Sequence, residues 1–181
     1  MSIIEIIAVV FSLISVILTV KNNVWCWPVG IVGIFFYMIL FLQHNIMGNA
    51  LLQLLFIAQS AYGWYKWGEP SKYPIKWLSG GSRESVVGAT GLLVILFSII
   101  IQNKGGQNPY LDGSTTALSI MAMLLMAYRK IDAWVLWIIA DLIFIGFFYI
   151  NGLYLSSGIY VIFLILATLG LFEWKKSIKT A

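Results

Sequence analysis

The sequence contains one cysteine, one histidine and few charged residues, and each scarcity excludes a class of protein. Cys26 alone cannot form an internal disulfide, and His44 alone cannot build a histidine-based metal cluster. The chain also lacks a phosphate-binding loop, a zinc-binding signature and a Ser–His–Asp set, so no cofactor or metal is expected. Only 10% of its 181 residues are charged, whereas a soluble domain carries roughly 25%. Since 61% are hydrophobic, we expect the chain to be embedded in a lipid bilayer.

The hydrophobic residues form seven runs that are long enough to cross a bilayer. A hydrocarbon core of about 30 Å needs roughly 20 helical residues at 1.5 Å each, and some runs only just suffice. Because the runs show no two-residue alternation, helices rather than β-strands are expected. The first run lacks the features of a cleaved signal, so we expect it to be retained. The predicted spans are residues 3–20, 24–42, 48–64, 86–101, 113–127, 133–150 and 155–172.

The basic residues divide unequally between the two sides of such a protein. With seven spans, one side receives ten Lys and Arg residues and the other receives only Lys104. Because basic loops stay in the cytoplasm, this division predicts an outside N-terminus and an inside C-terminus. Topology thus accounts for the net charge of +4, and no nucleic-acid partner is expected.

The order of the spans suggests an internal duplication. Trp27 and Trp64 are 37 residues apart, as Trp137 and Trp174 are, which gives a repeat offset of 110. Since three spans reverse the direction of the chain, an extra span must cross back before a second triplet can begin in the same orientation. We therefore predict an all-α, 3+1+3 membrane protein with parallel repeats. Its parts would be a first three-helix bundle, a cytoplasmic linker, a linking transmembrane helix and a second bundle, at residues 1–67, 68–84, 85–102 and 113–177.

A carboxylate lies inside the sixth run, where an ionised Asp costs about 2.5–3.5 kcal/mol on insertion scales. Trp134, Trp137 and Asp141 have i, i+3, i+7 spacing and share one helix face. No Lys or Arg lies inside any predicted span, so an internal ion pair is not evident. Two indoles and a carboxylate could stack and neutralise a flat cation. Proton coupling and a neutral structural Asp are the alternatives.

A second stripe follows the third run, where Gln53, Ser60, Trp64 and Trp67 share a face. Gln53 offers both a donor and an acceptor, and a hydrogen bond between helices explains it equally well. Gly30 and Gly33 are better explained by close helix packing than by pocket space.

The eight tryptophans have two interpretations. Membrane tryptophans usually form belts at the headgroups, and we assign Trp25, Trp67 and Trp77 to such a belt. For Trp64 and Trp137 we favour a pocket or gate.

Three motifs carry a resemblance to a known family: LLQLLF at 51–56, YGWYKW at 62–67 and WVLWIIAD at 134–141. With them the chain resembles the Pnu family of bacterial vitamin transporters over nearly its whole length. The resemblance implies a seven-helix fold related to the SWEET sugar transporters, in the bacterial inner membrane. It also implies facilitated diffusion of a vitamin precursor, which a cytosolic kinase then traps by phosphorylation.

The same resemblance implies which residues contact the substrate. Riboside-type members are expected to carry Asn where this chain has Gly33, Ser60 and Asp141. The loss of three amides and the gain of a negative charge favour thiamine, which is a cation without a ribose. Nicotinamide riboside is also a cation, so charge alone does not separate the two vitamins. Riboflavin, which is uncharged, comes third. The candidate substrate-binding residues are Gln53, Ser60, Trp64, Trp134, Trp137, Asp141, Gly33, Tyr37 and Tyr160.

Two other classes of function are alternatives to transport. An enzyme is not expected, because acid–base chemistry would need a second titratable group near Asp141. A membrane sensor or subunit stays open as the alternative of a different class. The expected partners are the bilayer, a small vitamin and, in a homotrimer, further copies of the chain.

Overall fold

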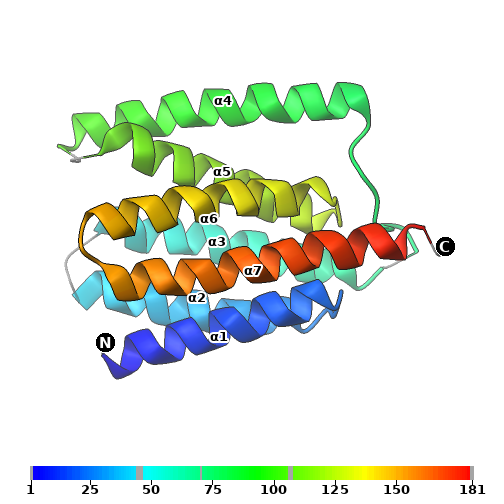
Figure 1. Ribbon diagram of the computed structural model, residues 1–181, viewed down its shortest axis with the longest axis horizontal. Coiled ribbons are helices and arrows are strands. Elements are labelled where there is room, and N and C mark those ends of the chain that lie inside the picture. The colour runs from blue at the N-terminus through cyan, green and yellow to red at the C-terminus, as the bar shows by residue number, and fades with distance from the viewer. Residues whose placement is uncertain (1, 44–46, 70, 106–107, 180–181) are drawn as a thin grey trace. The chain divides into compact units, whose positions relative to one another are not determined.

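The computed structural model describes residues 2–43, 47–69, 71–105 and 108–179, and seven helices account for most of them. Figure 1 shows them in chain order. The helices are α1 (Ile3–Val20), α2 (Cys26–Gln43), α3 (Met47–Trp67), α4 (Gly80–Asn103), α5 (Pro109–Ala127), α6 (Asp132–Ile150) and α7 (Tyr154–Ser177). The predicted all-α class with seven helices is thereby confirmed.

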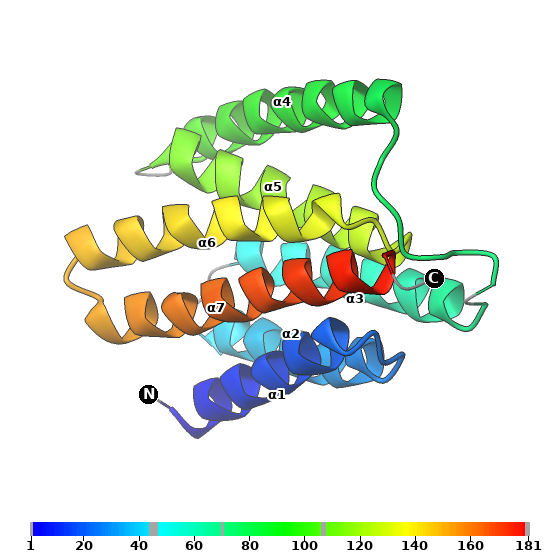
Figure 2. The ribbon, with the colours of Figure 1, turned by 45° about the vertical axis from the view of Figure 1, so that its right-hand side comes forward.

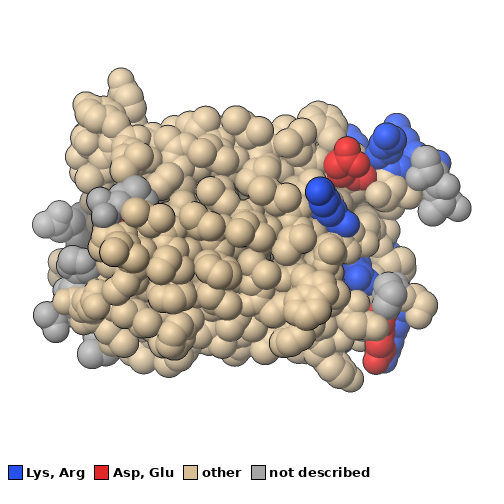
Figure 3. Space-filling model, turned by 90° about the horizontal axis from the view of Figure 1, so that it is seen from below, with Lys and Arg blue, Asp and Glu red and all other residues tan. Residues whose placement is uncertain are grey.

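Within the described residues, six helices, those other than α3, are long and apolar enough to cross a membrane. Helix α3 has 21 residues, so it is roughly 30 Å long. Its hydropathy is lowered by polar side chains such as Gln53 and Gln59. On the face drawn in Figure 3, most of the surface carries no Lys, Arg, Asp or Glu, as expected for a surface covered by lipid. The orientation of the chain in the membrane stays a prediction.

The helix ends follow local chemistry where the sequence provides it. Helix α1 begins with a capping box, in which Glu5 N–H donates to Ser2 Oγ at 3.1 Å and Ser2 N–H donates to Glu5 Oε2 at 3.3 Å.

Helix α4 begins at Gly80, inside the segment 68–84 predicted as a linker. The four-part division made from the sequence stays a prediction.

By its internal contacts the chain forms two compact units. The first contains residues 1–74 and 127–129, and the second contains residues 75–126 and 130–181. In the first unit, α2 packs against both α1 and α3. A Cβ on Gly30 would lie 2.8 Å from Ser15 Oγ, and one on Gly33 would lie 2.9 Å from Ser12 Oγ. The packing role predicted for these two glycines is therefore confirmed.

In the second unit, α6 and α7 lie side by side along their length, as Figures 1 and 2 both show. Helices α4 and α5 also approach closely, because a Cβ on Gly113 would lie only 2.7 Å from the Ser98 backbone nitrogen. A larger residue at position 113 would push these helices apart.

Both units contain the same packing motif. Trp27 meets Trp67 edge to face, with ring centroids 5.4 Å apart and planes at 89°. In the second unit Trp134 meets Trp174 at 5.5 Å and 87°. Such edge-to-face pairs are a favoured geometry of aromatic rings. The equivalent tryptophans are 107 residues apart, so the offset of 110 inferred from sequence matches is wrong by three residues.

A glycine completes the motif in each unit. A Cβ on Gly63 would lie 2.5 Å from the Trp27 ring, and one on Gly170 would lie 2.5 Å from the Trp134 ring. These glycines are also 107 residues apart. The repeat is thus marked by Gly-x-x-x-Trp on the third helix of each triplet and by a tryptophan at the beginning of the second.

The prediction that Trp67 belongs to a belt at the lipid headgroups is wrong. Its side chain is only 2% exposed and packs inside the first unit, whereas Trp25 is 62% exposed. The two were indistinguishable from the sequence, because their burial depends on which face of each helix meets a neighbour.

We predict that Gly63→Ala and Gly170→Ala will each lower the free energy of unfolding by about 1–3 kcal/mol, because the new methyl group overlaps an indole. Gly146→Ala is the matched control, since nothing lies within 4 Å of its Cβ position. Thermal unfolding in detergent, followed by tryptophan fluorescence, checks this. Equal melting temperatures for all three variants would contradict the motif.

Candidate functional site

The buried carboxylate of Asp141 lies on an aromatic stripe of α6. Asp141 is 4% exposed, and Trp137, one turn earlier on the helix, is half-buried. Phe144 and Phe148 follow one and two turns later, so the four side chains share one face. The stripe therefore places a carboxylate between an indole and two phenyl rings.

Tyr160 on α7 extends this aromatic surface. Its ring stacks on Phe144 with centroids 4.5 Å apart, and on Phe148 at 5.3 Å. The two ring planes are inclined to the Tyr160 ring by 29° and 21°. Sequence analysis selected Tyr160 but missed both phenylalanines, although their i+3 and i+7 spacing from Asp141 could have revealed them.

Among the described residues, no cation of the protein forms an ion pair with Asp141. In the described part of the chain the ion pairs are Lys72 with Glu69 and Arg83 with Asp132. No hydrogen bond to the Asp141 carboxylate is seen among these residues either. Removing an ionised carboxylate from water without a partner is costly. A cationic ligand is one way to offset that cost.

Trp134 lies on the same helix but has different surroundings. It is 2% exposed, with its ring held between Gly170 and Trp174 of α7. Its indole nitrogen has no hydrogen-bond partner among the described residues. The structure therefore gives Trp134 a packing role between α6 and α7, which the repeat shares through Trp27.

The candidates of the first unit are spread over α2 and α3. Ser60 is buried at 2% exposure, Gln53 is half-buried and Trp64 is 45% exposed. Gly33 is closed off by α1, and Tyr37 stacks along its own helix on Phe41 at 6.3 Å. Gln53, Ser60, Tyr37 and Trp64 each have a polar group that could hydrogen-bond a ligand, whereas Gly33 has none.

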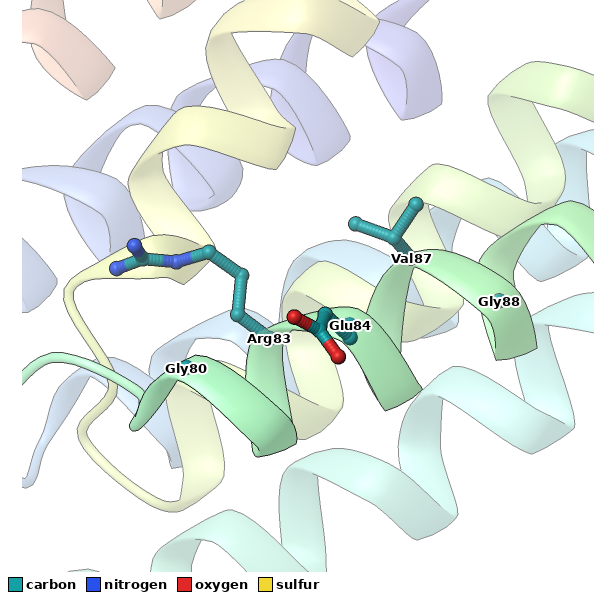
Figure 4. Close-up of a pocket in the computed structure, with 5 residues that line it drawn as sticks. All are labelled: Gly80, Arg83, Glu84, Val87 and Gly88. Carbon is teal, nitrogen blue, oxygen red and sulfur yellow. The ribbon is translucent and has the colours of Figure 1, made fainter.

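An open cavity of about 650 Å³ lies along the beginning of α4, lined by Gly80, Arg83, Glu84, Val87 and Gly88 (Figure 4). Arg83 extends from it toward the beginning of α6, where its Nε donates to Asp132 Oδ1 at 2.9 Å. None of the candidate residues lines this cavity, so we do not assign the site to it. Among the described residues, no group of three His, Cys, Asp or Glu could hold a metal ion.

Comparisons with known proteins identify relatives over nearly the whole chain. The family model described as nicotinamide mononucleotide transporter matches residues 2–176. The nicotinamide riboside transporter PnuC of Escherichia coli (strain K12) is 26% identical over 96% of this chain and 85% of its own length. The riboflavin/roseoflavin transporter RibM of Streptomyces davaonensis is 23% identical over 91% and 81%.

A solved structure supports the fold. The crystal structure of the vitamin B3 transporter PnuC superposes with a TM-score of 0.80 and covers 98% of this chain and 82% of that one. Its sequence is 23% identical, so this likeness supports the arrangement of helices alone.

We predict that Trp134→Ala will destabilise the protein by about 3–5 kcal/mol, because it leaves a cavity beside Gly170. Trp137→Ala is the matched change on the same helix and should cost less, since that side chain is half-buried. Denaturation of both variants in detergent checks this. A larger loss for Trp137→Ala would overturn the packing role of Trp134.

Proposed function

Since this chain belongs to the nicotinamide mononucleotide transporter family of membrane vitamin transporters, we propose that it carries nicotinamide riboside across the bacterial inner membrane. The observation that carries this proposal is the buried Asp141 on an aromatic stripe, which has no ion pair with any described residue. Nicotinamide riboside has a flat pyridinium ring with a permanent positive charge. Aromatic faces and a carboxylate together suit such a ring.

The names of the relatives weigh against the preference for thiamine. Those described above are named for nicotinamide riboside and for riboflavin. The absence of Asn at Gly33, Ser60 and Asp141 is a departure within one family, and it does not identify another vitamin. Riboflavin is neutral and would leave the Asp141 charge unbalanced, so we place it second.

In this proposal each part of the stripe has a distinct role. Asp141 balances the charge of the pyridinium, and Trp137 stacks on the ring. The stack of Phe144, Phe148 and Tyr160 continues the apolar surface on the other side of the carboxylate. Trp134 holds α6 against α7, so that the stripe keeps its shape. Gln53 and Ser60 stay candidates for polar contacts to the ribose or the carboxamide.

The proposed mechanism is facilitated diffusion by movement of the two units. The structure supports it through two compact units that share one packing motif, as parallel repeats in transporters do. Trapping of the vitamin by a cytosolic kinase and assembly as a homotrimer belong to the same proposal.

We predict that Asp141→Asn will weaken binding of nicotinamide riboside at least tenfold, which corresponds to about 1.4 kcal/mol. The amide keeps the shape of the side chain but removes its charge. Riboside-type members are expected to carry Asn at this position together with two further amides, which Gly33 and Ser60 replace in this chain, so a single amide at position 141 should not restore the affinity that the charge supplies. Calorimetry on purified protein checks this, with riboflavin and thiamine titrated in parallel. Asp112→Asn, which removes a half-buried carboxylate from α5, is the control and should leave binding unchanged.

The same titrations can refute the assignment. Unchanged affinity for nicotinamide riboside in Asp141→Asn would remove the charge-balance role. Binding of riboflavin or thiamine alone would identify a different substrate.

A second prediction concerns energy coupling. Uptake of nicotinamide riboside into proteoliposomes should proceed without any ion gradient and stop when the inside and outside concentrations are equal. Uptake that requires a proton or sodium gradient would refute passive transport. Binding without measurable flux would favour a sensor.

A further inference from the structure

The chain passes between its two units at three places, after Pro74, after Met126 and after Arg129. Residues 127–129 are the last residue of α5 and the turn that follows it. They belong to the first unit, although the rest of α5 and all of α6 belong to the second. If the units move, the backbone must bend at these crossings.

Arg129 anchors the turn in the first unit. Its Nε donates to Asn22 Oδ1 at 3.0 Å, and its Nη1 and Nη2 donate to the carbonyls of Tyr73 and Trp67 at 3.2 and 3.3 Å. The guanidinium also lies over the Trp67 ring at 4.6 Å. At 4% exposure, Arg129 is buried with its charge spread over neutral acceptors. Burial lowers the pKa of the guanidinium, which nonetheless stays protonated because arginine titrates so far above neutral pH.

The neighbouring Tyr128 adds a second attachment. Its hydroxyl lies 2.5 Å from the hydroxyl of Tyr62 on α3. The Lys66 ammonium faces the ring of Tyr128 at 4.9 Å and that of Tyr73 at 4.2 Å. Extracting the turn would therefore break several hydrogen bonds and cation–π contacts at once.

The turn is also the repeat equivalent of the turn between α1 and α2. Asn22 and Arg129 are 107 residues apart and are the two described residues other than glycine with positive φ, at 51° and 50°. The following residues repeat as well, since Asn23 N–H donates to Leu18 O and Lys130 N–H donates to Leu125 O, both at 2.9 Å. The repeat thus has one turn geometry, and the Arg of one copy donates to the Asn of the other.

Two of the crossings run side by side. These are the crossings after Pro74 and after Arg129. On their first-unit side, the Arg129 guanidinium donates to the Tyr73 carbonyl. On their second-unit side, Ile131 N–H donates to the Lys76 carbonyl at 3.1 Å, and Lys76 and Lys130 form a parallel β-bridge.

The second-unit end of this pair of segments is held by Asp132 at the beginning of α6. Its carboxylate accepts from Leu78 N–H at 2.8 Å and from Arg83 Nε at 2.9 Å. The two crossing segments are therefore anchored in the first unit by Arg129 and in the second by Asp132.

We propose that residues 73–76 and 129–132, paired side by side, form the hinge on which the two units move during transport, with Arg129 as the residue that positions its first-unit end. This inference rests on the proposed transport function. A hinge needs a few backbone positions that absorb the change in φ and ψ, between parts that move as rigid bodies. The boundaries after Pro74 and after Arg129 provide those positions, and the end of α5 after Met126 must bend with them. The anchors on both sides make whole helices follow the bending.

The first test separates positioning from binding. Arg129→Lys keeps the charge but loses the forked guanidinium, so it cannot reach three acceptors. We expect the maximal uptake rate to fall at least tenfold while the Kd for nicotinamide riboside changes less than twofold. Lys21→Ala, which removes an exposed basic residue beside Asn22, is the control. An unchanged rate, or a Kd that weakens as much as the rate falls, would overturn the proposal.

The second test does not depend on how well Arg129→Lys folds. In a Cys26→Ala background, Tyr62→Cys and Tyr128→Cys are joined by a short cross-linker that reduction cleaves. Both positions lie in the first unit, so the cross-linked protein should carry the vitamin as fast as the same protein after reduction. If the cross-link stops uptake and reduction restores it, the turn must leave the first unit during transport and the hinge is wrong.

Both tests are run with nicotinamide riboside, riboflavin and thiamine. Failure of the proposed function would be seen in the unmodified protein, as absent uptake of nicotinamide riboside. Failure of the hinge would be seen only in the variants, with whichever vitamin the unmodified protein carries.

Discussion

The packing of an indole edge against a second indole, with a glycine beneath the first ring, is the contact on which each unit depends. It occurs once in each unit, between the second and third helices of the triplet. Lipid provides little hydrophobic drive for helices to associate, so close packing at small residues must supply the stability. In the second unit this contact fixes the rotation of α6 against α7, and with it the direction in which the Asp141 stripe faces.

Among the described residues three charged side chains are buried, Arg129, Asp132 and Asp141. The surroundings of Arg129 and Asp141 differ in a way that separates structure from function. Arg129 has three hydrogen bonds and an aromatic face, so its polar atoms are satisfied within the protein. Asp141 has no such partner among the described residues. A group that the fold leaves unsatisfied at a real energetic cost is a candidate for binding a ligand, whereas a satisfied one is a candidate for holding the fold together.

Helix α6 links the proposed hinge to the proposed site. It begins at Asp132, which anchors the crossing segments, and it carries Asp141 two and a half turns later. Because Trp134 locks α6 onto α7, bending before Asp132 would move both helices as one body. The aromatic stripe and Tyr160 would then move together, without loss of the stacking that defines the candidate site.

Hydrophobic runs and their breaks determined the membrane class, the seven helices and most of their bounds, because span length and hydropathy are properties of consecutive residues. The sequence likewise revealed the isolated carboxylate, since it shows directly that the predicted spans contain no Lys or Arg. Tertiary structure decided the repeat offset of 107, the burial of Trp67 in place of Trp64, and the packing role of Trp134. It also decided the partners of Arg129, one of which is 107 residues away. These features depend on which helix faces meet, and contacts between distant residues leave no periodic signal in a single sequence.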